Sequence, residues 1–195
     1  MNKAILLSVR PEHAVNILNG AKTLELRKRV PKGFVGWVNL YCTKGKPRLS
    51  VVQDDENGKT YYYLNSNWGR ELNGDVVARF WFDEYDKYVD ATNCYMTSCG
   101  MQCDNEYMYQ LCELQDKLKN TCLTCDEIEA YGKGKDLYAW HIKNLEIFDY
   151  PMELSEFYTW NKGDKWTPDM NWLTLTRAPQ SWQYVYVKEW LDDTI

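Results

Sequence analysis

The first fifty residues alternate between short apolar runs and polar breaks, which predicts a strand, a helix and two further strands. Residues 4–9 form an apolar run typical of a buried strand. Pro11 then opens a helix, and Gly20 follows at the position of a C-terminal cap. Residues 23–29 alternate between leucines and polar side chains, so we expect a strand with one apolar and one charged face. Residues 36–43 form the next expected strand.

The rest of the chain reads as further strands with a helical region between them. Strands are expected at 49–53, 60–64, 76–82, 137–148 and 182–187, and residues 54–59 look like the turn of a hairpin. A helical pattern covers about 104–119. The capping box Thr124–Glu127 opens a second short helix that stops at Gly132. Residues 150–174 are rich in loop signals.

This order of elements predicts an α+β fold. Strands and helices do not alternate regularly, which argues against a doubly wound parallel sheet. We expect a small mixed β-barrel with helices in the connections and a helical Cys-rich insertion. The 195 residues fit a single domain, 1–195, with insertions at about 53–60 and 90–125.

Composition narrows the class of protein. Aromatic residues make up 15% of the chain, with 9 Trp and 15 Tyr, which excludes a disordered protein because each buried ring removes a large apolar area from water. No apolar run approaches the roughly 20 residues of a membrane span. The apolar part of the N-terminus is too short for a secretory signal. We expect a soluble, cytoplasmic protein with no membrane contact.

Charge is distributed unevenly. The chain carries a net charge of −5, yet residues 1–50 contain ten Lys and Arg against two Glu, an excess of +8, and the remainder carries −13. Such asymmetry is typical of a face that binds a polyanion. Alternatively, the two segments neutralise each other in the folded chain. The local excess favours a small, discrete anionic-ligand site over a broad basic surface.

Six of the seven cysteines fall within residues 94–125. Their odd number, without a secretory signal, argues against a disulfide framework. Cys122 and Cys125 have the spacing of a zinc knuckle, and Cys99 and Cys103 can complete a tetrahedral site. We favour free thiols in a reducing compartment, and we expect no cofactor.

The densest group of candidate functional side chains lies in residues 22–29. A carboxylate between two cations is held ionised by them. Here the carboxylate can accept hydrogen bonds from a base edge while a cation meets a phosphate. The alternative is a solvated strand face laced with ion pairs. The group comprises Lys22, Thr23, Glu25, Arg27, Lys28 and Arg29.

In these segments the chain resembles ASCH-domain proteins of the PUA-like superfamily, in particular the bacterial and phage-type branch. The Gly-x-Lys-Thr-x-Glu-x-Arg stretch that begins at Gly20 is the most specific part of the resemblance. The similar segments are residues 5–14, 17–29, 36–38, 41–43, 137–142 and 175–182.

The resemblance implies a PUA-like barrel with a cleft lined by Lys22, Thr23, Glu25 and Arg27. Related proteins bind RNA or hold a single, often modified, base. Some ASCH proteins are enzymes, and one branch hydrolyses N4-acetylcytidine with a Lys, a Thr and a Glu, while others cleave RNA. Lys22 matches that lysine, but the catalytic threonine falls on Glu25 here, and Thr23 stands two residues earlier.

Aromatic side chains and a loop complete the candidate site. An exposed ring can stack on an unpaired base, whereas a buried one contributes only to packing. We select Trp140 and the loop before the last strand, whose shape Pro179 constrains. The loop residues expected to close one wall are Arg177, Gln180, Ser181 and Trp182.

Three functions stay open. The preferred one is binding of RNA or of a possibly modified nucleotide or nucleobase. The second is a hydrolase acting on a nucleoside or on RNA, with Lys22 as base or nucleophile and Glu25 as proton carrier. The third is protein interaction through the acidic, Cys-rich residues 90–125.

Overall fold

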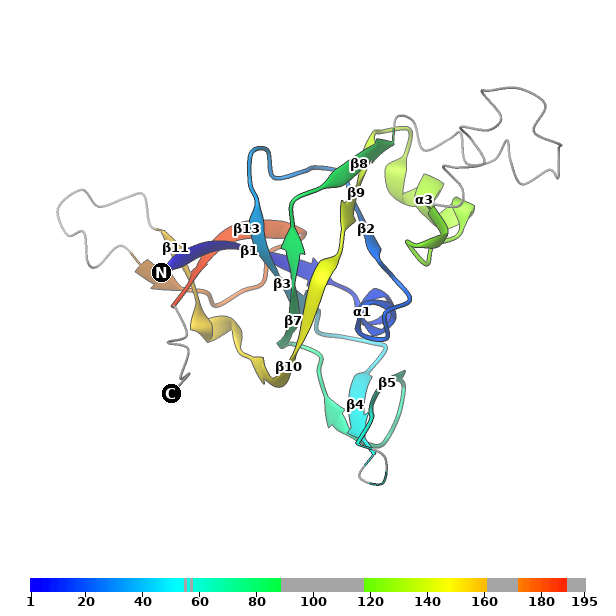
Figure 1. Ribbon diagram of the computed structural model, residues 1–195, viewed down its shortest axis with the longest axis vertical. Coiled ribbons are helices and arrows are strands. Elements are labelled where there is room, and N and C mark those ends of the chain that lie inside the picture. The colour runs from blue at the N-terminus through cyan, green and yellow to red at the C-terminus, as the bar shows by residue number, and fades with distance from the viewer. Residues whose placement is uncertain (55, 57, 89–117, 161–171, 189–195) are drawn as a thin grey trace, which may run out of the picture. The chain divides into compact units, whose positions relative to one another are not determined.

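The computed structural model describes residues 1–54, 56, 58–88, 118–160 and 172–188 (Figure 1). Two α-helices and one 3-10 helix have defined bounds in these ranges: α1 (Pro11–Leu18), α3 (Cys125–Gly132) and η2 (Leu154–Glu156). The strands are β1 (Asn2–Val9), β2 (Leu24–Arg27), β3 (Gly36–Cys42), β4 (Leu49–Gln53), β5 (Thr60–Leu64), β6 (Arg70–Glu71), β7 (Val76–Phe82), β8 (Tyr85–Tyr88), β9 (Leu137–His141), β10 (Lys143–Met152), β11 (Phe157–Trp160), β12 (Trp172–Thr174) and β13 (Trp182–Val187).

The chain divides into two compact units. Unit 1 comprises Met1–Leu18, Gly36–Trp81 and Asn144–Ile195, and unit 2 comprises Asn19–Val35 and Phe82–Lys143. The chain therefore passes repeatedly from one unit to the other. Each unit is described separately below.

Unit 1 is built on a seven-stranded sheet with the order β10-β7-β3-β1-β13-β11-β12. Strand β1 lies at its centre, parallel to β3 and antiparallel to β13. It forms here because it is apolar on both faces, and residues 4–9 are all buried. One apolar cluster of unit 1 consists of Ala4, Leu6, Tyr41, Val76, Met152, Phe157, Leu175 and Val185.

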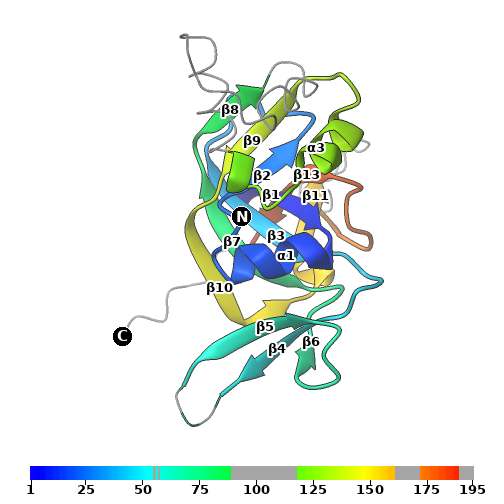
Figure 2. The ribbon, with the colours of Figure 1, turned by 90° about the vertical axis from the view of Figure 1, so that its right-hand side faces the viewer.

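A second, three-stranded sheet of unit 1 has the order β5-β4-β6. Strands β4 and β5 form the expected hairpin, with Gln53 opposite Thr60. The turn is closed by the amide of Asp54, which donates to the carbonyl of Lys59 at 2.8 Å. Figure 2 shows this sheet beside α1, whose buried face includes Ala14 and Ile17.

Unit 2 contains the three-stranded sheet β2-β9-β8 and helix α3 (Figure 2). Helix α3 begins with the predicted capping box, because Thr124 Oγ1 accepts from the amide of Glu127 and the Glu127 carboxylate accepts from the amide of Thr124. One apolar cluster joins helix and sheet through Leu24, Leu26, Tyr88, Leu118, Ile128, Leu137 and Ala139.

Most of the expected strands are present, and the differences have local causes. The apolar run at 137–148 forms two strands, because β9 belongs to the sheet of unit 2 whereas β10 belongs to the seven-stranded sheet. Asn144, which has a φ of 48°, lies just after the point where the chain leaves β9 and begins β10. The segment 150–174, expected to be mainly loop, contains β11 and β12, and their register pairs Tyr158 with Thr174. Strands β6 and β8 were not expected either.

The fold is of the expected α+β class, with helices in the connections. Among the described strands the sheets are open, since the seven-stranded sheet ends at β10 on one side and β12 on the other. The predicted insertion at 90–125 and the helix at 104–119 lie largely outside the described residues; only residues 118 and 119 of that helix are described, and both are helical. None of the described helices has the length and apolar character to cross a membrane.

Candidate functional site

Lys22, Glu25 and Arg27 form a charged network in unit 2. Lys22 Nζ lies 3.2 Å from Glu25 Oε2, and Arg27 Nη2 lies 2.8 Å from Glu25 Oε1. Lys22 Nζ also donates to the carbonyl of Thr121 at 2.6 Å. The side chains of Lys22, Glu25 and Arg27 are 1%, 6% and 11% exposed. Glu25 is thus the acceptor that joins two cations.

Local structure places this network. Gly20 takes a φ of 74°, a conformation that glycine adopts without strain, and the chain turns from the end of α1 toward β2. The amides of Thr23 and Leu24 both donate to the carbonyl of Asn120, at 3.0 and 3.1 Å. Leu24 and Leu26 enter the apolar cluster of unit 2, so alternation puts Glu25 and Arg27 on the opposite face of the sheet.

Burial distinguishes this network from a solvated strand face, the alternative that the sequence left open. A charge removed from water is costly unless it is paired and hydrogen-bonded. Counted as whole residues, backbone included, Lys22 and Glu25 are 2% and 5% exposed, and both are paired. The three side chains carry two positive charges and one negative.

Trp140 lies on the same face as Glu25. The register of β2 and β9 places Glu25 opposite Trp140, and cross-strand partners project from the same side of a sheet. The Trp140 side chain is fully buried, and its ring centroid lies 4.9 Å from that of Phe82. The structure therefore brings the predicted Trp140 next to the predicted Glu25 as cross-strand neighbours.

The other predicted residues near the network are exposed. Thr23 contributes its backbone, since its carbonyl accepts from the amide of Ile142 at 2.9 Å. Lys28 Nζ lies 5.0 Å from the centroid of the Tyr131 ring, a cation–π distance. Arg29 follows it and is exposed.

The predicted loop wall belongs to unit 1. Ser8 Oγ donates to the carbonyl of Pro179 at 2.6 Å, and the amide of Ser8 donates to the carbonyl of Ser181 at 2.9 Å. Arg177 and Gln180 are exposed, and Trp182 begins β13. The loop is thereby fastened to the end of β1. Its role as a wall of the site stays a prediction.

The cysteine predictions are only partly within the described residues. Cys122 and Cys125 are half-buried thiols that form no disulfide, and Cys99 and Cys103 lie outside the described ranges. In the part of the chain that the structure describes, no group of three metal-ligating side chains occurs. Cys42 is buried, and burial, with Asp75 nearby, raises the pKa of its thiol to about 12.

A cluster of ionisable groups around β8 was not expected from the sequence. His141 Nε2 lies 2.9 Å from Asp86 Oδ2, and Lys143 Nζ lies 2.7 Å from Glu84 Oε2 and 2.9 Å from Asp83 Oδ1. The hydrogen bond from Lys143 lowers the pKa of Glu84. The sequence does show an acidic run at 83–86, which could have indicated such a cluster. Which basic side chains face these carboxylates, however, depends on the pairing of β8 with β9.

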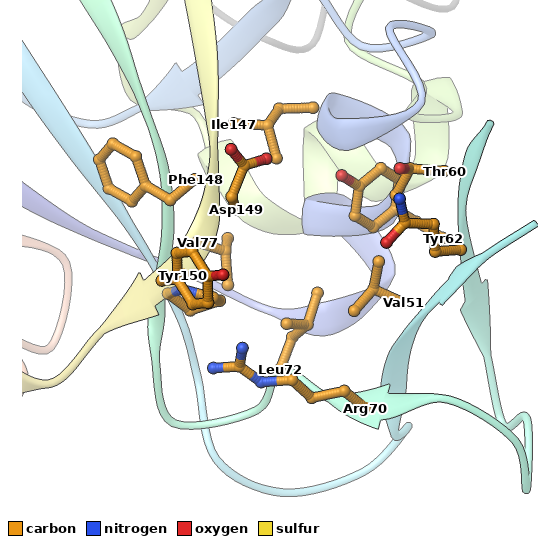
Figure 3. Close-up of a pocket in the computed structure, with 12 residues that line it drawn as sticks. Val51, Thr60, Tyr62, Arg70, Leu72, Val77, Ile147, Phe148, Asp149 and Tyr150 are labelled. Carbon is orange, nitrogen blue, oxygen red and sulfur yellow. The ribbon is translucent and has the colours of Figure 1, made fainter. Parts of the chain in front are cut away.

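Unit 1 also contains a hollow of about 740 Å³ that no sequence motif indicated (Figure 3). Ile147 and Asp149 of β10 line one side, and Tyr62 of β5 and Val51 of β4 line the other. Burial, with the Asp149 carboxylate nearby, raises the pKa of Tyr62. The residues that line this hollow include none of the predicted site residues.

Comparisons with known proteins define the class of fold. No family model matches the chain, and no curated protein matches it. Among solved structures, ASCH from Zymomonas mobilis is similar over 94% of this chain and 87% of its own, with a TM-score of 0.52 and 14% identity. A serine-to-alanine mutant of the same Zymomonas mobilis protein is similar over 94% and 88%, with a TM-score of 0.52 and 13% identity.

The chain thus has the α+β fold of an ASCH protein, which confirms the expected fold. At these identities the likeness concerns the fold, and function has to be argued from the side chains.

Proposed function

We propose that the protein binds RNA or a nucleotide at the face of unit 2 that carries Lys22, Glu25 and Arg27. The observation that carries this proposal is the buried network of two cations around one carboxylate. The Glu25 side chain is only 6% exposed and already contacts both cations, so the exposed residues beside it are the ones that meet a ligand. The adjacent exposed Lys28 and Arg29 supply charge for phosphate.

The contacts of Lys22 favour binding over hydrolysis. A lysine that acts as nucleophile or base needs a free lone pair on its nitrogen. Lys22 Nζ instead faces two acceptors, the Thr121 carbonyl and the Glu25 carboxylate, which suits a protonated ammonium donor. Incubation with N4-acetylcytidine and with single-stranded RNA, followed by chromatography, tests the hydrolase alternative. Product formed by the wild type and lost in Lys22→Met would support that alternative.

The binding proposal is tested by fluorescence anisotropy with labelled single-stranded RNA and by calorimetry with nucleoside monophosphates, each over a series of salt concentrations. Phosphate contacts release counterions, so each contact contributes a slope of about 0.7 to log K against log salt for a single strand. The double variant Lys28→Gln/Arg29→Gln removes two exposed charges and leaves the buried network intact. We expect weaker binding and a slope smaller by about 1.4 if both residues contact phosphate.

Lys135→Gln is the matched control, because it removes an exposed charge from the same unit. It should bind RNA as the wild type does. The proposal fails if the wild type binds neither RNA nor nucleotide at low salt, or if the double variant and the control bind equally well.

A further inference from the structure

The hollow in unit 1 has a floor that combines apolar side chains with one cation. The register of β4 with β5 and β6 places Tyr62, Val51 and Arg70 in one row across the three-stranded sheet, and cross-strand partners share a face. Leu72 and Val77 also line the hollow, and they are 2% and 1% exposed. A volume of about 740 Å³ lies within the range of pockets that bind small ligands. The floor therefore offers an apolar surface with a guanidinium group beside it.

Strand β10 supplies the opposite wall of the hollow and the opposite charge. Burial, and then the nearby Asp149 carboxylate, raise the pKa of Tyr62, so Asp149 of β10 lies close to the β5 side. Figure 3 shows Asp149 at one end of the hollow and Arg70 at the other. In the part of the chain that the structure describes, no ion pair joins either charge to another side chain, although Asp75 lies near Arg70. The hollow therefore has one negative and one positive end.

Strand β10 also has an edge with which a further chain can pair. It is the last strand of the seven-stranded sheet, so one of its edges has no partner among the described strands. Its residues 147–151 line the hollow. An extended peptide can donate and accept hydrogen bonds along such an edge. Ile147 and Tyr150, which are 36% and 85% exposed, present apolar surface there for a ligand to cover.

We infer that the hollow binds a short zwitterionic peptide, with its ammonium group at Asp149, its carboxylate at Arg70 and an apolar side chain on the floor. A ligand that is only anionic meets Asp149 as a like charge, and a ligand that is only cationic meets Arg70 in the same way. A peptide with two free termini carries one charge for each of these residues and a backbone for the edge of β10. The inference is independent of the proposed function, whose residues lie in unit 2.

The test is an NMR titration of the full chain with the tripeptide Ala-Leu-Ala and with the same tripeptide blocked at one end. The tripeptide is shorter than the β10 segment 147–151, and its leucine matches the apolar floor. Acetylation removes the ammonium charge, and amidation removes the carboxylate charge. Each block should weaken binding to the wild type by about 5-fold, the upper end of what one exposed ion pair contributes.

Two variants assign each end of the peptide to its partner. Arg70→Gln should bind the free tripeptide about 5-fold more weakly than the wild type does, yet bind the amidated tripeptide equally well. Asp149→Asn should in the same way lose affinity for the free tripeptide and keep its affinity for the acetylated one. A variant that had lost its fold would bind none of these peptides, so retained binding of the blocked peptide separates recognition from folding.

The matched controls are Lys46→Gln and Glu56→Gln. Each removes an exposed charge of unit 1 that does not line the hollow. Both controls should therefore keep the preference of the wild type for the free tripeptide.

Several results would overturn the inference. They are no binding of Ala-Leu-Ala to the wild type, equal binding of free and blocked peptides, and an unchanged preference in Arg70→Gln or in Asp149→Asn. Free leucine that binds as tightly as the tripeptide would also overturn it, because a peptide backbone would then contribute nothing. Loss of the preference in both variants, with its retention in both controls, would support the inference.

Discussion

Replacement of Glu25 by Gln should be among the most destabilising conservative changes in unit 2. The Glu25 carboxylate contacts Lys22 at 3.2 Å and Arg27 at 2.8 Å, and its side chain is only 6% exposed. Gln has the same shape but no charge, so two largely buried cations lose their counterion. Breaking a buried ion pair by removing one partner costs about 3–5 kcal/mol. For a chain of this length that corresponds to a fall in Tm of roughly 6–20 °C.

Lys22→Met provides the matched comparison. It leaves Glu25 paired with Arg27 and leaves one buried acceptor, the carbonyl of Thr121, without its donor. An unsatisfied buried acceptor costs about 1–3 kcal/mol. We therefore expect Glu25→Gln to lower stability more than Lys22→Met does.

Urea unfolding followed by fluorescence and by circular dichroism measures both variants. If the unfolding transitions measured by fluorescence and by circular dichroism coincide, the two units unfold together and a single free energy of unfolding describes the protein. A loss below about 1 kcal/mol for Glu25→Gln, or a larger loss for Lys22→Met, would refute the reasoning, because it would mean that the network is hydrated rather than buried.

Three further predictions concern other parts of the fold. The thiol of Cys42, with its pKa raised to about 12, should resist iodoacetamide at pH 8 in the native protein and react in urea, as followed by peptide mass spectrometry. Gly69→Ala should cost about 1–3 kcal/mol in thermal unfolding, because a Cβ there would overlap the backbone at φ of 83°; Gly33→Ala, with φ of 69° and open space, should cost less. Lys143→Gln should raise the pKa of Glu84 toward its ordinary 4.5 in a carbon-detected NMR titration. Because the folded-state pKa of Glu84 is lowered, its pairing with Lys143 stabilises the fold at a pH above the ordinary pKa. This stabilisation is lost as the pH falls through the lowered pKa. A Glu84 pKa that is the same in Lys143→Gln and in the wild type would contradict the pairing.

Local signals predicted most elements because the physics behind them is local. Pro11 begins α1 as expected, and the Thr124 capping box begins α3. The apolar run of β1 and the hairpin of β4 and β5 follow from period and turn composition. Strands β11 and β12 were not expected, because β11 forms by pairing with a strand far along the chain, as in the pair Phe157 and Val187. Short strands of this kind depend on tertiary pairing rather than on their own pattern.

The sequence predicted which residues form the candidate site, but it did not predict their burial or their partners. Spacing alone put Glu25 and Arg27 on one face, yet the same spacing fits a solvated strand. Burial of Lys22 depends on the carbonyl of Thr121, which is 99 positions away in sequence. The pairing of His141 with Asp86 also needed the β8–β9 register, which no local pattern specifies.

Residues 118–121 are anchored in unit 2, and this anchoring fixes two of the carbonyl groups on which the charged network depends. Tyr88 and Leu118, which bound residues 89–117, belong to the same apolar cluster. The carbonyls of Asn120 and Thr121 are then held by Leu24 and Lys22. Lys22 therefore depends for one of its acceptors on a segment 99 positions away in sequence, and a substitution that displaces residues 118–121 also disturbs the charged network.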